Sequence, residues 1–199
     1  VEFGRKFWEY IKEAKYSHIN KSTQNAQFYR FTSPKSNEYP FMIEIFSRNP
    51  DYIILEDDAY LTPLPIDEEV SSLSAILLNE EYYELLKTGQ IIVDGIPVLR
   101  PTCLIPFKMK AYLDLSMRKK NGEHVDSKNI KKHKNDVFRL AQVIALDTRQ
   151  MVSAEILEDM KQFLGLVEND NVDLKTIGIK EISYKTMIEL LYRCYFTKD

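Results

Sequence analysis

Glu44 is the first residue whose setting could support chemistry, because it is a lone carboxylate inside the apolar run Phe41–Phe46. Side chains of an extended strand alternate between two faces, and both faces of this run carry apolar residues. A carboxylate in such a strand is costly unless it is paired or bound to a metal ion. Two interpretations follow: a cross-strand ion pair with Arg30, which is the simpler one, or a metal-binding or general-base carboxylate.

Lys108 is the second candidate, because it shares a helical face with apolar residues. Positions i, i+4, i+7 and i+11 of this helix lie on one side, and they hold Leu104, Lys108, Ala111 and Leu115. The Lys108 ammonium either reaches past the apolar stripe to solvent or points into a cleft and holds a phosphate. Lys110 differs, since it precedes Asp114 by four residues and is expected to form an ordinary surface pair.

Asp136 is the third candidate, on a later helix. We expect that helix to bury the stripe Ile130, Val137, Leu140 and Ile144. Asp136 lies on an adjoining polar face with Lys132 and Arg139, where a surface charge ladder is the simplest interpretation. The histidines show no ligand-like spacing, so no zinc site is expected from His18, His124 and His133.

Charge is distributed unevenly along the chain, although the formal net charge is only −3. Residues 51–84 contain ten acidic residues and no basic one, whereas residues 108–139 contain ten Lys or Arg against four acids. This pattern predicts either a basic face that attracts phosphates or two solvated surfaces of opposite charge. The pI near 5.7 argues against a general nucleic-acid coat protein.

Composition indicates a folded chain that does not cross a membrane. It has 199 residues, of which 44% are hydrophobic and 29% charged, enough for one domain with a core plus a helical extension. No apolar run approaches the roughly 20 residues that span a bilayer. The two cysteines make neither a disulfide framework nor a metal knuckle, which is typical of a reducing cytoplasm.

The elements expected to position these residues change character near residue 100. Before it, we predict a helix from the apolar residues of positions 3–11, paired strands at 27–31 and 41–46, and an extended segment at 60–66. A short helix at 79–86 and a hairpin turning at Asp94-Gly95 follow. Beyond it, we predict helices at 104–119, 126–146, 153–164 and 183–196.

Three segments together resemble the AbiEii-type nucleotidyltransferases of abortive-infection and toxin–antitoxin systems. They are Arg100–Leu115 with Lys108 three residues before Ala111, the run Lys134-Asn-Asp-Val-Phe-Arg-Leu140, and the strand Met42–Phe46. The resemblance covers most of residues 1–146. It implies an α+β, DNA-polymerase-β-like nucleotidyltransferase fold, in which residues 1–100 are the later part of the α/β core and residues 101–199 a helical domain.

The resemblance also implies an activity and site roles. A nucleotide would pass from a nucleoside triphosphate to an RNA, such as tRNA, or to a protein acceptor, with Mg²⁺ as cofactor and a cognate antitoxin protein as a possible partner. Lys108 would contact nucleotide phosphate, Asp136 would be the later acidic residue, and Glu44 the third, metal-binding carboxylate. Arg118, Lys132 and Lys134 are further nucleotide-binding candidates.

The chain departs from this family at the motifs that carry the chemistry. It has no Gly-Gly or Gly-Ser turn and no Asp-x-Asp pair, and Asn135 and Arg139 replace the lysine and second aspartate of the later motif. We expect the missing motifs to lie upstream of Val1, and the chain as given to be inactive, because Glu44 alone cannot hold two metal ions. The alternative is a non-catalytic module that binds a partner protein or RNA.

Overall fold

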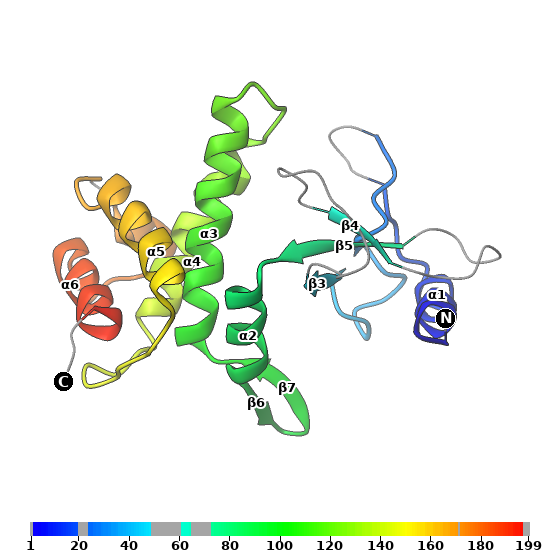
Figure 1. The fold of residues 1–199 in the computed structure, drawn as a ribbon, viewed down its shortest axis with the longest axis horizontal. Helices are drawn as coiled ribbons and strands as arrows, with labels where there is room; N and C mark the ends of the chain where they lie inside the picture. Colours follow the sequence, from blue (N-terminus) through cyan, green and yellow to red (C-terminus); the bar gives the residue numbers. More distant parts are fainter. Residues whose placement is uncertain (1, 20–23, 49–60, 65–72, 171, 197–199) are drawn as a thin grey trace. The chain divides into compact units, whose positions relative to one another are not determined.

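The computed structural model describes residues 2–19, 24–48, 61–64, 73–170 and 172–196 (Figure 1). Contacts between Cα atoms divide the chain into two compact units, Val1–Tyr83 and Glu84–Asp199. Helices and small mixed sheets make up the fold, so the predicted α+β class is confirmed. The predicted boundary at residue 100 falls inside the second unit. Among the described helices, none has the length and apolarity needed to cross a membrane.

The first unit is built on an amphipathic N-terminal helix, α1 (Glu2–Glu13), as the sequence predicted. Its buried face presents Trp8 and Ile11 to a small core that also contains Phe31. The Trp8 and Phe31 rings meet edge to face, with centroids 5.6 Å apart. Such pairs stabilise a core beyond the area they bury.

Two small sheets lie beside this helix in the first unit. Strand β1 (Arg30–Thr32) pairs antiparallel with β2 (Met42–Glu44), which confirms the predicted pairing. Strand β5 (Leu73–Leu78) lies between β3 (Phe46–Arg48), to which it is parallel, and β4 (Leu61–Leu64), to which it is antiparallel. Strand β4 falls within the predicted extended segment, whereas β5 was not predicted.

The predicted single strand at 41–46 is wrong, because Ile45 divides it between the two sheets. The Ile45 amide donates to the Tyr29 carbonyl at 2.9 Å, and the Ile45 carbonyl accepts from the Ile76 amide at 2.8 Å. The strand is also not buried on both faces, since Phe41 is 78% exposed and Phe46 45% exposed. The cost of placing Glu44 there is therefore smaller than the sequence suggested.

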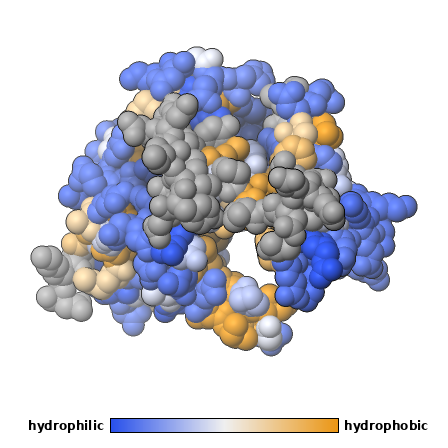
Figure 2. All heavy atoms as spheres, turned by 45° about the vertical axis from the view of Figure 1, so that its right-hand side comes forward, coloured by the Kyte–Doolittle hydropathy of each residue, from blue (hydrophilic) through white to orange (hydrophobic). Residues whose placement is uncertain are grey.

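The hairpin of the second unit follows α2 (Glu80–Thr88), a helix capped by the Asn79 side chain. Strands β6 (Gln90–Val93) and β7 (Ile96–Leu99) pair around Asp94 and Gly95, so the predicted hairpin is confirmed. Both turn residues have positive φ, 51° and 78°, the geometry that favours Asp-Gly in a two-residue turn. The hairpin is rich in exposed hydrophobic side chains, which gather at the lower edge of Figure 2.

Four α-helices and one short 3₁₀ helix complete the second unit. They are α3 (Pro101–Lys120), α4 (Ser127–Ala141), α5 (Ala154–Val167), η1 (Leu174–Ile177) and α6 (Tyr184–Tyr195). The side chains of Asp126, Ser153 and Ser183 cap α4, α5 and α6. The predicted helices are confirmed in number and order, but α4 ends at Ala141 rather than near residue 146.

The packing stripes of α3 and α4 differ from those predicted. On α3 the buried residues are Cys103, Ile105, Pro106, Met109 and Leu113, so the predicted stripe with Lys108 is wrong. On α4 they are Val137, Phe138 and Ala141, followed by Ile144 beyond the helix end. Lys108 therefore borders the core, because the buried face of α3 is rotated away from it.

Candidate functional site

Lys108 and Asp136, which the sequence singled out separately, are brought together where α3 packs against α4. The Lys108 Nζ lies 3.7 Å from an Asp136 carboxylate oxygen. Both side chains are partly buried, with 26% and 19% of their surfaces exposed. The pair therefore joins α3 to α4 through opposite charges at the boundary of the two helices.

Arg139 completes the group from the next turn of α4. Its guanidinium lies 3.1 Å from the other Asp136 oxygen, so the Arg139 part of the predicted charge ladder is present, whereas no ion pair joins Lys132 to Asp136. A second donor of the same guanidinium, Nε, reaches the Ile177 carbonyl at 3.4 Å. Lys108, Asp136 and Arg139, here called the Lys108 cluster, thus combine two cations with one carboxylate and carry a net positive charge.

The chemistry open to the Lys108 cluster is anion binding. One carboxylate neutralises one of the two cations, so the group retains the capacity to bind a phosphate. Asp136 is already shared by Lys108 and Arg139, and its role in this arrangement is to orient them. Sequence reasoning did not include Arg139 among the site residues, although its spacing of three residues from Asp136 was a usable signal.

Lys110 is not the ordinary surface pair that the sequence predicted. It lies 3.8 Å from Asp114 as expected, but it also donates to Asp159 of α5 at 3.1 Å. Burial opposes the charged lysine, yet Asp114 and Asp159 outweigh burial and raise the pKa of Lys110. Burial and the nearby Asp159 charge raise the pKa of Asp114. Lys110 therefore ties α3 to α5 and is a structural residue.

Glu44 forms the cross-strand ion pair with Arg30 that was the simpler sequence interpretation. The two residues are register partners of β1 and β2, and two guanidinium nitrogens lie 2.6 Å from the same Glu44 oxygen. Among the described residues, no three His, Cys, Asp or Glu side chains gather as a metal site would require. Glu44 belongs to the first unit and the Lys108 cluster to the second.

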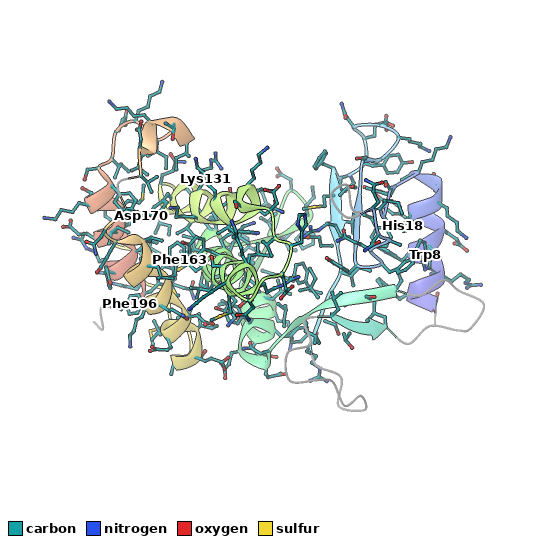
Figure 3. The ribbon with its side chains drawn as sticks, turned by 90° about the horizontal axis from the view of Figure 1, so that it is seen from above. Trp8, His18, Lys131, Phe163, Asp170 and Phe196 are labelled. Carbon is teal, nitrogen blue, oxygen red and sulfur yellow. The ribbon has the colours of Figure 1, made fainter. Side chains whose placement is uncertain are left out.

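The remaining nucleotide-binding candidates have separate surroundings. Arg118 pairs with Glu123 at 2.7 Å, and Lys134 pairs with Asp170 at 2.6 Å. Asp170, the partner of Lys134, follows the end of α5 and is labelled in Figure 3, as is Lys131 of α4. Lys132 is exposed, and its ammonium has no partner among the described residues. The structure therefore joins only Lys108 and Asp136 of the predicted site residues.

Comparisons of the chain with protein-family models, with curated proteins and with solved structures returned no match. The resemblance to nucleotidyltransferases therefore rests on the sequence segments given above, and the site rests on its own geometry.

Proposed function

We propose that this chain acts in nucleotidyl transfer and that its Lys108 cluster binds the phosphates of a nucleoside triphosphate. The observation that carries the proposal is the meeting of Lys108 and Asp136 at the α3–α4 contact. These residues lie in separate motifs that resemble the AbiEii type, and their proximity is what a shared site requires.

The proposed role of the cluster is electrostatic. Transfer of a phosphoryl-type group depends mainly on positioning the triphosphate and stabilising its charge. Lys108 and Arg139 would each donate to phosphate oxygens, and Asp136 would keep both cations directed toward the same place. Partial burial strengthens such contacts because it lowers the local screening by water.

Magnesium is the cofactor expected for such a transfer, but the described residues do not fit a magnesium site. Glu44 is bonded to Arg30 through one oxygen, and no cluster of three candidate ligands is present among the described residues. We therefore assign to this part of the chain the binding of phosphates and derive no step through the metal ion.

Replacing Lys108 tests this proposal. Lys108→Met keeps much of the side-chain volume but removes a charge-assisted contact worth about 1.5–3 kcal/mol, so the affinity for a labelled nucleoside triphosphate should fall about tenfold or more. Equilibrium dialysis measures the affinity, and a thermal melt of each variant shows that the fold is retained. Lys185→Met is the matched control, because Lys185 is an 88% exposed lysine on α6.

Lys110 is unsuitable as a control, since it supports the α3–α5 contact. Equal affinities of Lys108→Met and Lys185→Met would remove the case for phosphate binding at Lys108.

The second candidate function is that of a binding module without catalysis, for RNA or for a partner protein such as an antitoxin. The observation that favours it is a group of exposed lysines near the α3–α4 turn. The ammonium groups of Lys120, Lys128, Lys131 and Lys132 have no partners among the described residues. Such cations remain available to an acidic partner. An RNA-binding measurement is the direct way to separate this function from triphosphate binding.

A further inference from the structure

The β6–β7 hairpin (Figure 1) is a two-stranded sheet with which no third strand pairs among the described residues. Ile92 and Ile96 are more than 60% exposed, and three further apolar residues are between 40% and 46% exposed: Ile91, Val93 and Val98. A two-stranded hairpin is at best marginally stable by itself in water, and a contiguous exposed apolar surface is typical of an interaction site. The hairpin therefore has the features of a surface that a partner covers.

The hydrogen-bond alternation of the hairpin determines which of its backbone groups point outward. The Arg100 amide donates to the Gly89 carbonyl at 3.0 Å, so Gly89 and Arg100 form a hydrogen-bonded pair at the open end. Bonded and non-bonded pairs alternate along an antiparallel ladder, and the pair of Ile92 with Pro97, three positions further on, is therefore non-bonded. Residues of a non-bonded pair direct their N–H and C=O groups away from the strand beside them.

The two outer edges of the hairpin consequently differ. On β7, Pro97 occupies an outward-facing position and has no N–H, so this edge cannot form a continuous ladder with a further strand. On β6, the outward-facing groups belong to Gln90 and Ile92, and each of these residues has both an N–H and a C=O. No backbone hydrogen bond joins them to another segment in the described part of the chain. Strand β6 is therefore the edge that is open to a further strand.

We propose that β6 of a second copy of the chain pairs with this edge, antiparallel across a two-fold axis, to give a four-stranded sheet. A two-fold contact requires a surface that complements itself. Strand β6 carries no charged residue, so two copies meet without like-charge repulsion along the ladder. The register that places Ile92 opposite its counterpart also places Ile91 opposite Val93 of the second copy. Apolar side chains then meet on both sides of the axis.

The block on β7 limits this pairing to two chains. If both edges of the hairpin were open, each added copy would leave a new open edge, and the sheet would grow into a fibre. With Pro97 on both outer strands, the four-stranded sheet offers no unblocked edge to a further copy. An open β6 edge combined with a blocked β7 edge therefore matches a closed dimer.

Two other occupants fit the hairpin less well. A strand of a different protein is usually selected by charges or side-chain pockets beside the edge, whereas both strands of this hairpin are uncharged. A membrane would have to accept the tip of the hairpin first, and the tip carries the exposed carboxylate of Asp94. The uncharged edge therefore favours an identical strand.

Analytical ultracentrifugation of the chain over the micromolar range tests the proposal. The native chain should sediment as a dimer that dissociates on dilution. Ile92→Pro removes an outward N–H from β6 of each copy, so the dissociation constant should rise about tenfold or more. The hairpin itself tolerates this change, because the Ile92 N–H takes no part in pairing with β7. Ile96→Asn is the matched control, since it removes a similarly exposed side chain but no outward donor, and it should keep the dimer.

Pro97→Val is a second variant, whose expected effect is a gain of association. It restores an N–H on the outer edge of β7, so its assemblies should exceed a dimer and grow with concentration. A thermal melt of each variant shows that the fold is retained.

A native chain that stays monomeric would overturn the proposal, as would Ile92→Pro that dimerises as tightly as the native chain. Dissociation of Ile96→Asn to the same extent as Ile92→Pro would show that the apolar faces rather than the β6 edge make the contact. Pro97→Val that remains a dimer would show that β7 is not the blocked edge. Each of these results would leave phosphate binding at the Lys108 cluster unaffected, because the hairpin contributes no residue to that cluster.

Discussion

Asp136 contacts two cations, one on each of two neighbouring helices. Asp136 accepts a hydrogen bond from Arg139 on its own helix and forms an ion pair at 3.7 Å with Lys108 on the neighbouring helix. The conformational entropy of the Lys108 and Arg139 side chains is then lost on folding, before any ligand binds. Such ordering is the physical basis on which we propose that the cluster binds phosphate.

Glu44 and Arg30 provide a prediction at the same scale. Because both side chains are partly exposed, at 20% and 39%, their ion pair should stabilise the fold by no more than about 1 kcal/mol. We expect Glu44→Gln and Arg30→Met each to lower the free energy of unfolding by a few tenths to about 1 kcal/mol. The double variant should lose less than the sum of the two. Urea denaturation of the four proteins gives these values.

An additive double variant would show that the pair contributes nothing to stability. A Mg²⁺-dependent rise in melting temperature that Glu44→Gln abolishes would instead return Glu44 to the role of a metal ligand.

At the scale of elements, the α3–α5 contact has a predictable pH dependence. The pKa of Lys110 is raised above its ordinary value of 10.5 in the folded chain, because Asp114 and Asp159 outweigh burial. The stabilisation by Lys110 is therefore fully present below about pH 10.5 and is lost as the pH rises through the raised pKa. We expect the stability difference between the native chain and Lys110→Met to shrink above that pH.

The native chain has to be compared with Lys110→Met because ionisation of buried tyrosines also destabilises the fold at alkaline pH. Burial, with Tyr10 and Tyr39 nearby, raises the pKa of Tyr16 to about 12, and burial also raises the pKa of Tyr195. The native chain and Lys110→Met both keep these tyrosines, so the effect of tyrosine ionisation cancels in the stability difference between them. A stability difference that stays constant from neutral pH to pH 12 would show that Lys110 has no charge-dependent role.

The sequence predicted local elements better than packing. Capping residues and the Asp94-Gly95 turn act within a few residues, and the helices and hairpin that they mark are present. The face of α3 could not be deduced in the same way, because apolar residues occur nearly all around the helix. The parallel pairing of β3 with β5 joins distant segments, and no local pattern reports it.

In the candidate site, too, local features could be predicted from the sequence and packing could not. Lys108 and Asp136 could be selected from their motifs, and the Asp136–Arg139 pair follows from helical spacing. Their meeting depends on how α3 and α4 pack, as does the contact of Lys110 with Asp159. The contacts between helices were therefore the part of the site that could not be predicted from the sequence.

At the scale of the molecule, the two units differ in what they offer to a ligand. The first contains small sheets, an aromatic core and the closed Arg30–Glu44 pair. The second contains the Lys108 cluster and the exposed lysines Lys128 and Lys132 of α4. It also carries the apolar β6–β7 hairpin, where Ile92 is 68% and Ile96 63% exposed. The Lys108 cluster, on which the proposed phosphate binding rests, thus lies in the second unit.

The most direct test of the central claim is a double-mutant cycle on the two cations of the Lys108 cluster. Binding of a labelled nucleoside triphosphate is measured for the native chain, Lys108→Met, Arg139→Met and the double variant. If both cations hold the same triphosphate, each single change should lower affinity about tenfold or more, and the combined loss should differ from the sum because Asp136 couples the pair. Equal affinity of all four proteins would contradict the claim.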